Sequence, residues 1–501
     1  MIVLTDDLLL NYTRCTRRAY LMVYGDRSQR TADKEFVLKL RREHQRLVQD
    51  HLTGQTVVTP DYAPGDWQAG AEQTELLMAQ GVEQIHRGIL YWDAPLSTLD
   101  SLTTTPQAIT AVGRPTLLVK QTGSSRFGDW CYRPVNIKLG KRPKSEYKIV
   151  AAFQAILLAH VQTMPPTLAQ LILRDGGTYR VDLAQWEGKV WEVILDCLAM
   201  LGAGEVPEVF ISRQRCSLCP WYDHCHQEAA ASQHLSLVPG VTPSRYSALQ
   251  AVGITELAQL AQLDPQWLQP EVDRPIASQM QQQALALVDD RALPTPEAMV
   301  RSQTFPPLAP IELYFDLEAE PDRNVDFLFG VLCVNHVKQT ETFHGFFAEK
   351  PEDEPLIWQQ FLALLHRYPT APIVHFSAYE VETIKRLTKR YRMSQYPLKT
   401  LLPRFIDVHD WLLKLAVLPV ESYSLKSVAK WLGFTWRDEG LSGDQTVCLY
   451  EKWLEAGDQD ALETIIRYNE DDCRATHKLR VWLTEWQQSL HPFQGDEPPQ
   501  G

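Results

Sequence analysis

The sequence predicts an α/β protein with more than one domain: a mixed amino-terminal region, a helical middle, and a carboxy-terminal mixed sheet flanked by helices. A chain of 501 residues is long enough to bury two or three separate cores. From residue 311 onward, three successive strand-like runs are followed by alternating helical and strand-like patterns. This order is typical of a mixed sheet that is covered by helices.

The composition is globular and acidic. Hydrophobic residues make up 45% of the chain and charged residues 22%, which excludes general disorder. The net charge of −13 argues against a protein that coats nucleic acid by bulk electrostatics, although a carboxylate site for divalent metal is compatible with it. Residues 1–12 contain two aspartates rather than a signal sequence, and the most apolar stretch is too short to span a bilayer. We therefore expect a cytoplasmic protein without a membrane partner.

Residues 1–228 form the first expected domain. Periodic apolar residues and strand-like runs predict its elements. In order, these are a helix over 36–52, strands over 116–119 and 130–137 joined by a Gly-Ser turn at 123–125, and a helix over 146–162. Between residues 114 and 148 there are nine lysines and arginines but only two acids, so this stretch is locally basic.

A small polar linker over 229–234 leads to a helical connector with expected bounds of 235–300. Residues 237–261 predict two short helices around a turn. The segment resembles a helix-hairpin-helix module, because Gly240 and Gly253 allow tight turns whose backbone N–H groups can approach phosphates. A plain pair of spacer helices is the alternative, since the motif is short.

Residues 308–486 form the expected carboxy-terminal domain. The predicted elements, in order, are strands over 311–319, 325–334 and 340–347, a helix over 356–368, a strand over 373–376, a helix over 379–392, a short apolar segment over 405–408, and helices over 411–416, 425–432 and 462–486. The rest of the chain, 487–501, is rich in proline and glycine toward its end and is expected to be disordered.

Two acidic motifs in this domain indicate metal chemistry. Asp316 and Glu318 are two residues apart in a strand, so both side chains lie on one face of the sheet. Paired carboxylates repel each other unless a cation lies between them, and hard divalent cations prefer oxygen ligands. Tyr468 and Asp472 are four residues apart and share one face of the last helix, which must pack on the sheet to bury its apolar residues. This combination suits a two-metal site for displacement at phosphorus.

These motifs, in this order and with strands after the first, resemble the DEDD exonuclease branch of the RNase H-like superfamily in its tyrosine subclass. The resemblance covers roughly residues 308–486 and implies a 3′-to-5′ exonuclease, a phosphodiester hydrolase that uses two Mg²⁺ or Mn²⁺ ions. It assigns Asp316 and Glu318 to the first motif and Tyr468 and Asp472 to the third.

The second motif of that family usually places an aspartate just after the fourth strand. Here Glu380, in IVHFSAYE, stands in that position, and we assign it as a further catalytic residue and metal ligand. A glutamate in the first helical turn, favoured there by the helix dipole alone, is the alternative interpretation. Asp407, in RFIDVHD, is the competing candidate for the ligand.

The nine cysteines fall into two groups. Cys131, Cys197, Cys333, Cys448 and Cys473 lie singly in apolar surroundings and are expected to be buried. The others are Cys15, Cys216, Cys219 and Cys225, and the spacing of the last three suggests zinc or an iron–sulfur cluster. Together the four resemble the iron–sulfur staple of RecB-like nucleases of the PD-(D/E)XK fold. The resemblance covers roughly residues 1–228 and implies one [4Fe–4S] cluster, with Zn²⁺ as the alternative because thiolates suit both.

That family's active site requires a histidine, two acids, a lysine and a glutamine. His44, Lys138 and Gln154 stand in the expected places. Thr116 and Asn136, however, stand where the acids are expected, and neither carries the charge that holds Mg²⁺. We therefore expect a catalytically degenerate site whose basic surroundings bind nucleic acid. Rescue by Asp129 or Glu146 is the alternative.

Taken together, the sequence predicts a metal-dependent 3′–5′ exonuclease that acts on DNA or RNA through its carboxy-terminal domain, while the amino-terminal domain binds the nucleic acid. The order of domains resembles that of bacterial RecB-like nucleases with an RNase H-like domain at the carboxy terminus. Two alternatives remain: a dual-site nuclease with an active RecB-like site, and a non-catalytic nucleic-acid-binding scaffold.

Overall fold

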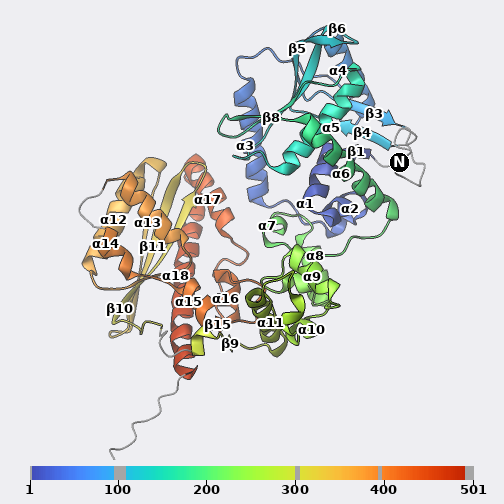
Figure 1. The fold of residues 1–501 in the computed structure, drawn as a ribbon. Coiled ribbons are helices and arrows are strands. Elements are labelled where there is room, and N and C mark those ends of the chain that lie inside the picture. Colours follow the sequence, from blue (N-terminus) through green and yellow to red (C-terminus); the bar gives the residue numbers. More distant parts are fainter. Residues whose placement is uncertain (1–2, 95–108, 300–304, 393–397, 491–501) are drawn as a thin grey trace, which may run out of the picture. The chain divides into compact units, whose positions relative to one another are not determined.

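The computed structural model describes residues 3–94, 109–299, 305–392 and 398–490 (Figure 1). The chain divides into two compact units, residues 1–228 and residues 229–501. None of the described helices is long and apolar enough to cross a membrane. Both units combine sheets with helices, so the predicted α/β class is confirmed.

The first unit contains two sheets. A five-stranded sheet has the order β2 (Gln84–His86), β5 (Leu117–Ser125), β6 (Gly128–Ile137), β7 (Ala169–Ile172) and β8 (Thr178–Val181). A smaller sheet has the order β1 (Val3–Thr5), β4 (Ile109–Gly113) and β3 (Leu90–Ala94). The helices are α1 (Asp6–Arg14), α2 (Thr16–Tyr24), α3 (Glu35–Leu52), α4 (Trp67–Ala79), α5 (Ser145–Gln162), α6 (Leu183–Ala203), α7 (Arg213–Cys216) and α8 (Tyr222–Ala231).

Helix α5 is buried on nearly all sides, as its apolar sequence requires. Phe153 and Leu157 pack into a core with residues of both sheets, whereas Ala151 and Ala155 pack against β7 and β8. Burial on both faces leaves the polar Gln154 in the interior, 1% exposed, where it needs hydrogen-bond partners.

Two local predictions for this unit are wrong. Residues 123–125 belong to β5 rather than to a turn. The β5–β6 pairing shifts register between Thr122 and Ser125, and the chain turns at residues 126–127. The expected linker is helical over its first three residues, since three alanines, which favour helix, extend α8 to Ala231.

The second unit is built on a mixed sheet. Its order is β12 (Thr340–Phe347), β11 (Val325–Asn335), β10 (Ile311–Glu320), β13 (Ile373–His375) and β14 (Phe405–Asp407). The first three strands pair antiparallel, whereas β13 pairs parallel with both β10 and β14. The predicted mixed sheet, with β10 at its centre, is confirmed.

Helices cover this sheet and form a smaller bundle before it. They are α9 (Pro243–Ala251), α10 (Leu257–Ala261), α11 (Arg274–Asp289), α12 (Glu354–Arg367), α13 (Tyr379–Arg390), α14 (Leu398–Leu401), α15 (Val408–Leu415), α16 (Leu425–Trp431), α17 (Gly443–Ala456) and α18 (Gln459–Leu490). The short strands β9 (Leu293–Pro294) and β15 (Ala416–Val417) pair with each other. Gly240 and Gly253, with φ of +92° and +78°, adopt the left-handed conformation that turns beside α9 require.

Alternation along β10 decides which residues face which helices. Leu313, Phe315 and Leu317 enter a core formed with α12, α13 and α17. Tyr314 belongs to the opposite core, which contains Leu479 of α18. Because strand side chains alternate, Asp316 and Glu318 share the face of Tyr314.

Two differences from the sequence prediction concern the end of the chain. Helix α17 was not predicted, and α18 begins three residues earlier and continues to Leu490. Disorder from residue 487 is therefore wrong for 487–490, where buried Gln487 accepts a hydrogen bond from the Phe305 N–H. The remainder of the expected tail, 491–501, lies outside the described residues.

Candidate functional site

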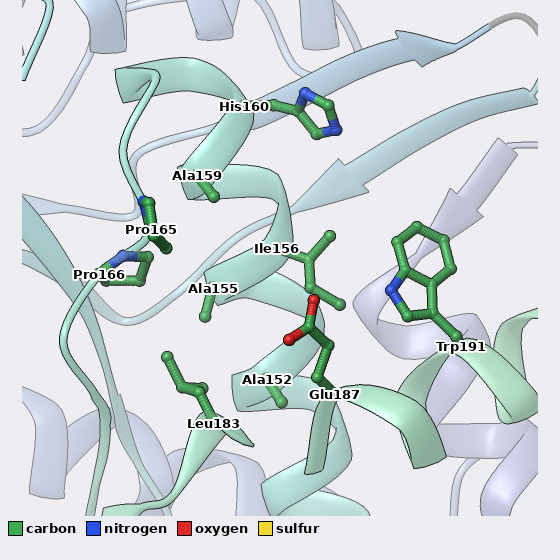
Figure 2. A pocket seen from close by; sticks show the side chains of 10 residues that line it. All are labelled: Ala152, Ala155, Ile156, Ala159, His160, Pro165, Pro166, Leu183, Glu187 and Trp191. Atoms are coloured by element: carbon green, nitrogen blue, oxygen red, sulfur yellow. The ribbon is translucent and has the colours of Figure 1, made fainter. Parts of the chain in front are cut away.

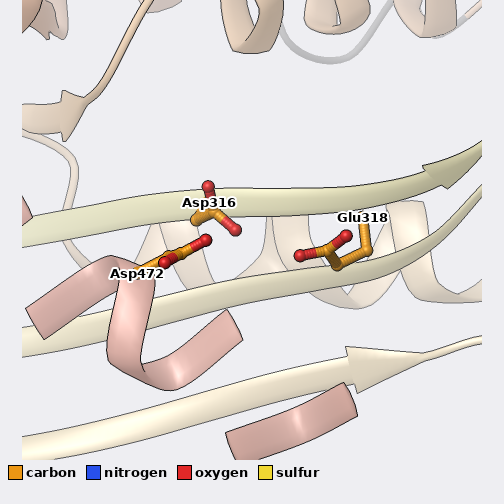
Figure 3. Close-up of side chains that lie close together, drawn as sticks. All are labelled: Asp316, Glu318 and Asp472. Carbon is orange, nitrogen blue, oxygen red and sulfur yellow. The ribbon is translucent and has the colours of Figure 1, made fainter. Parts of the chain in front are cut away.

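Asp316, Glu318 and Asp472 form a compact carboxylate cluster. Each offers an oxygen, and the three oxygens lie within 4.8 Å of one another. Figure 3 shows the two strand residues from β10 facing the aspartate of α18. Asp472 lies 154 and 156 positions along the sequence from Glu318 and Asp316, so distant segments supply one set of oxygen ligands, the kind that divalent cations prefer.

Helix α18 brings Asp472 and Tyr468 to the sheet because its apolar face packs on β10 and β11. Ile465 and Leu479, at either side of these residues along the helix, are fully buried in the two cores. Tyr468 and Asp472 are 5% and 9% exposed. The spacing of four residues places both on the same face, as the sequence indicated.

A neighbouring glycine allows this close packing. Gly330 of β11 is directly opposite Asp316 in the strand register. A Cβ at Gly330 would lie 1.6 Å from Oδ1 of Asn469, so no other residue fits there without a shift. Asn469 uses the space to donate a 2.6 Å hydrogen bond from Nδ2 to Oδ2 of Asp316. The amide therefore orients the carboxylate.

The other two carboxylates are also held by hydrogen bonds. Thr446 of α17 donates from Oγ1 to Oε2 of Glu318 at 2.6 Å. Trp436 donates from its indole Nε1 to Oδ1 of Asp472 at 2.7 Å. These hydrogen bonds set the orientation of the two acids before any ligand binds.

Burial among like charges raises the pKa of all three acids. The pKa of Asp472 rises to about 7 and that of Glu318 to about 8, with burial as the largest cause. Burial and the charges of Asp472, Glu318 and Glu380 raise the pKa of Asp316 well above its usual range. A bound divalent cation would favour the ionised carboxylates, so this donor set fits the metal ions that the sequence prediction requires.

Glu380 and Asp407, the two candidates for the second motif, have different surroundings. Glu380 is 4% exposed, lies 3.5 Å from Nδ1 of His375, and is close enough for its charge to act on Asp316. Asp407 instead caps α15, where its Oδ1 accepts from the backbone N–H groups of His409 and Ser377. The geometry therefore favours Glu380, although it lies outside the 4.8 Å cluster.

The residues expected to form a nuclease-like constellation in the first unit lie around β6. His44 Nε2 lies 2.9 Å from the carbonyl oxygen of Ile137, and Thr116 Oγ1 accepts from the Ile137 N–H at 3.2 Å. Asn136 donates from Nδ2 to Oε1 of Gln154 at 2.6 Å. Thr116 and Asn136, which stand where the resemblance expects acids, thus bond to a backbone N–H and to a side-chain amide.

Sequence reasoning missed one acid at this constellation, Asp6 at the start of α1. Gln154 Nε2 and the Arg114 N–H each donate to its Oδ2 at 2.7 Å, while its buried Oδ1 has no hydrogen-bond partner among the described residues. Burial raises the pKa of Asp6 to about 6, and burial lowers the pKa of nearby Lys138 against the opposing charge of Asp6. Asp6 is 130 residues from Asn136, so no local motif could reveal it.

The two acids considered for rescue of this site are placed differently. Asp129 is exposed near the start of β6, seven residues from Asn136, which at about 3.3 Å per strand residue is roughly 23 Å away. Glu146 lies 3.7 Å from Arg14. Neither makes a hydrogen bond to the constellation among the described residues.

Cys15, Cys216, Cys219 and Cys225 line one small cavity with Trp221. Burial raises the pKa of Cys225 to about 11 and also raises those of Cys216 and Cys219. Within the described chain, no three of the four sulfurs lie within 4.8 Å of one another. A single tetrahedral zinc with ligands at about 2.3 Å requires sulfur separations of about 3.8 Å. The remaining five cysteines are buried, as predicted.

A larger apolar pocket of about 340 Å³ lies between α5 and α6 (Figure 2). Alanines, prolines, Ile156 and Leu183 form most of its lining, with His160 and Glu187 as its polar groups. The His160 ring is stacked on Trp92 at 3.9 Å between centroids. Glu187 is the acid in this lining, so the pocket lacks the several convergent acids of the carboxylate cluster. We assign it no catalytic role.

Comparison with known protein families supports the fold expected for the carboxy-terminal domain. The family model for the RNase_H superfamily matches residues 313–484, a span that contains all three members of the carboxylate cluster. No curated protein matches the chain. The carboxy-terminal domain is therefore RNase H-like, as the sequence motifs predicted.

Proposed function

We propose that this protein is a metal-dependent 3′–5′ exonuclease that cleaves DNA or RNA with its carboxy-terminal domain, for which we keep the bounds 308–486. The observation that carries the proposal is the cluster of Asp316, Glu318 and Asp472 within 4.8 Å, with Tyr468 on the same helix face. A purely binding protein has no need to bury three repelling carboxylates together, which argues against a non-catalytic scaffold.

Asp316, Glu318, Glu380 and Asp472 would hold two Mg²⁺ or Mn²⁺ ions. The ions would supply Lewis acidity at the scissile phosphate and stabilise charge on the leaving oxygen. Asn469, Thr446 and Trp436 keep the ligands in place through their hydrogen bonds.

Tyr468 contributes a neutral hydroxyl. Burial and the neighbouring carboxylates raise its pKa, so the phenol stays protonated at neutral pH and can donate a hydrogen bond. We propose that it orients the attacking water and takes no part in metal binding.

For the first domain, residues 1–228, we propose a RecB-like fold that binds nucleic acid through its basic stretch. The helical connector 235–300 would add backbone contacts to phosphates if it acts as a helix-hairpin-helix module. The four converging cysteines would hold one [4Fe–4S] cluster. A single Zn²⁺ is the alternative, because thiolates suit both groups.

The test is cleavage of end-labelled single- and double-stranded DNA and RNA with and without Mn²⁺. A 5′ label should yield a ladder of shortening products, and a 3′ label should be released as a mononucleotide. Asp316→Ala should abolish this cleavage with the fold intact by circular dichroism. Glu455→Ala removes an exposed carboxylate of α17 and should cleave as the wild type does. Full activity of Asp316→Ala would overturn the catalytic assignment.

One observation favours a second candidate function, a dual-site nuclease. Asp6 supplies a buried carboxylate beside Gln154 and Lys138, where sequence reasoning found no acid. Mn²⁺-dependent cleavage that persists in Asp316→Ala and disappears on adding Lys138→Ala or Asp6→Asn would establish this second site. Its absence would leave the first domain as a binding platform.

A further inference from the structure

Lys426 lies in the first turn of α16, at the border of the carboxylate site. Its Nζ is 4.9 Å from the ring centroid of Tyr468 and 5.7 Å from that of Trp436. Tyr468 precedes Asp472 by one helical turn, and Trp436 donates a hydrogen bond to Asp472. Two aromatic rings therefore hold this ammonium beside the metal-ligand acids, as rings commonly hold cations.

The ammonium is half-buried and is not used in an ion pair. Neighbouring cations are paired, Arg437 with Asp471 and Arg467 with Asp438, but among the described residues no carboxylate oxygen lies within 4.0 Å of Lys426 Nζ. Longer-range attraction from Asp472, Asp444 and Glu318 opposes the effect of burial on its charge. Lys426 thus keeps three N–H donors for another acceptor in the site.

The charge balance of the loaded site indicates what that acceptor is. Asp316, Glu318, Glu380 and Asp472 carry four negative charges, which two divalent ions neutralise. A phosphodiester that enters the site brings a further negative charge, and the Lys426 ammonium lies beside Tyr468, close enough for Asp472 and Glu318 to act on its charge. A lysine acts on phosphate as a compact point charge that does not depend on base sequence.

We propose that Lys426 contacts a backbone phosphate of the nucleic-acid strand in the carboxylate site, an inference that rests on the proposed nuclease function. It is a binding residue for the substrate, and it is separate from the metal ligands. A different role, neutralising the acids until metal binds, would use the same position but would affect metal affinity rather than substrate affinity.

The test uses the full-length protein and four variants. Lys426→Met keeps the apolar stem against the two rings and removes the charge, Lys426→Gln repeats the charge removal with a polar group, and Lys426→Arg keeps the charge. Lys430→Met is the matched control, one turn further along α16 and exposed. Thermal unfolding shows which variants fold.

Single-turnover cleavage of labelled oligonucleotides in Mn²⁺ is measured over a range of protein and salt concentrations. In Lys426→Met the half-saturating protein concentration should rise about tenfold, equally for two unrelated sequences, and the salt dependence should flatten by about one unit of slope. Lys426→Arg and Lys430→Met should stay close to the wild type. Mn²⁺ binding, followed by electron paramagnetic resonance, should be unchanged or tighter in Lys426→Met.

Wild-type values for the cleavage of Lys426→Met and Lys426→Gln would overturn this inference and leave the nuclease intact. Weaker Mn²⁺ binding with an unchanged half-saturating concentration would also overturn it, because Lys426 would then support the ligands. Failure of the proposed function is distinguishable, since the wild-type protein itself would then show no Mn²⁺-dependent cleavage.

Discussion

Gly330→Ala should disable the carboxylate site although residue 330 carries no chemistry. The new Cβ would lie 1.6 Å from Asn469 Oδ1 and 2.7 Å from its Cγ, whereas side-chain contacts begin at about 3.0 Å. The gap must widen by about 1.4 Å. Asn469 is fully buried and cannot swing into solvent, so either its amide rotates away from Asp316 or α18 moves off the sheet.

Either response lowers the free energy of unfolding and the reaction rate by an amount that can be estimated. Overpacking of a well-packed core costs about 1–3 kcal/mol, and loss of the hydrogen bond to the Asp316 carboxylate costs about 1.5–3 kcal/mol. A displacement of about 1 Å at a catalytic group lowers the rate roughly 100-fold. We therefore expect at least a 100-fold lower single-turnover rate in Mn²⁺ and a fall of about 1–3 kcal/mol in the free energy of unfolding, measured by urea denaturation.

A double-mutant cycle isolates the cause. Asn469→Ala removes the atoms that the new Cβ would meet, so Gly330→Ala should be much less destabilising in that background, with a coupling energy of about 1–3 kcal/mol. Gly188→Ala, at an open position of α6, is the control and should leave cleavage unchanged. Additive effects in the cycle, or a fully active Gly330→Ala, would refute the argument that residue 330 must be glycine for Asn469 to pack against the strand.

Three further predictions concern Tyr468, the pKa values of the carboxylate cluster and the four converging cysteines. Tyr468→Phe should lower the single-turnover rate sharply while Mn²⁺ binding stays intact, because only a hydroxyl is lost; an unchanged rate would reduce Tyr468 to a packing role. The raised pKa values of Asp472 and Glu318, about 7 and 8, mean that the folded unit binds more protons than the unfolded chain between about pH 4 and 8, so metal-free protein should lose stability as pH rises through this window and regain it on adding Mg²⁺. Calorimetry of wild type and Asp472→Asn checks this, and a wild-type stability that rises with pH relative to the variant would contradict it. Protein purified without oxygen should absorb broadly in the visible range, and Cys219→Ser should bleach it and destabilise the first unit; a colourless sample with stoichiometric zinc would replace the cluster by the alternative metal.

Periodicity explains why much of the candidate site could be predicted from the sequence. A strand places residues two apart on one face, and a helix places residues four apart on one face, whatever lies around them. Asp316 with Glu318 and Tyr468 with Asp472 are pairs of this kind. The apolar residues that flank each pair further require the helix to lie on the sheet, so the sequence alone could indicate that the two pairs meet.

Residues that act across elements could not be predicted in this way. Thr446 comes from α17, a helix that was not predicted, and Asn469 faces Asp316 because a glycine on the next strand leaves the space. Gly330 was itself a signal, since a glycine inside an apolar strand often marks a close approach of another element. The interpretation of that signal required knowing which side chain approaches.

In the first unit, too, some site residues could be identified from the sequence and another could not. The resemblance to RecB-like nucleases grouped His44, Lys138 and Gln154 with Thr116 and Asn136, which carry no charge. Only the tertiary structure brings Asp6 to Gln154, because β1 pairs with β4 and so sets the start of α1 beside Gly113. Sequence periodicity determines which face a side chain occupies, but long-range strand pairing and helix packing decide which distant side chains share that face.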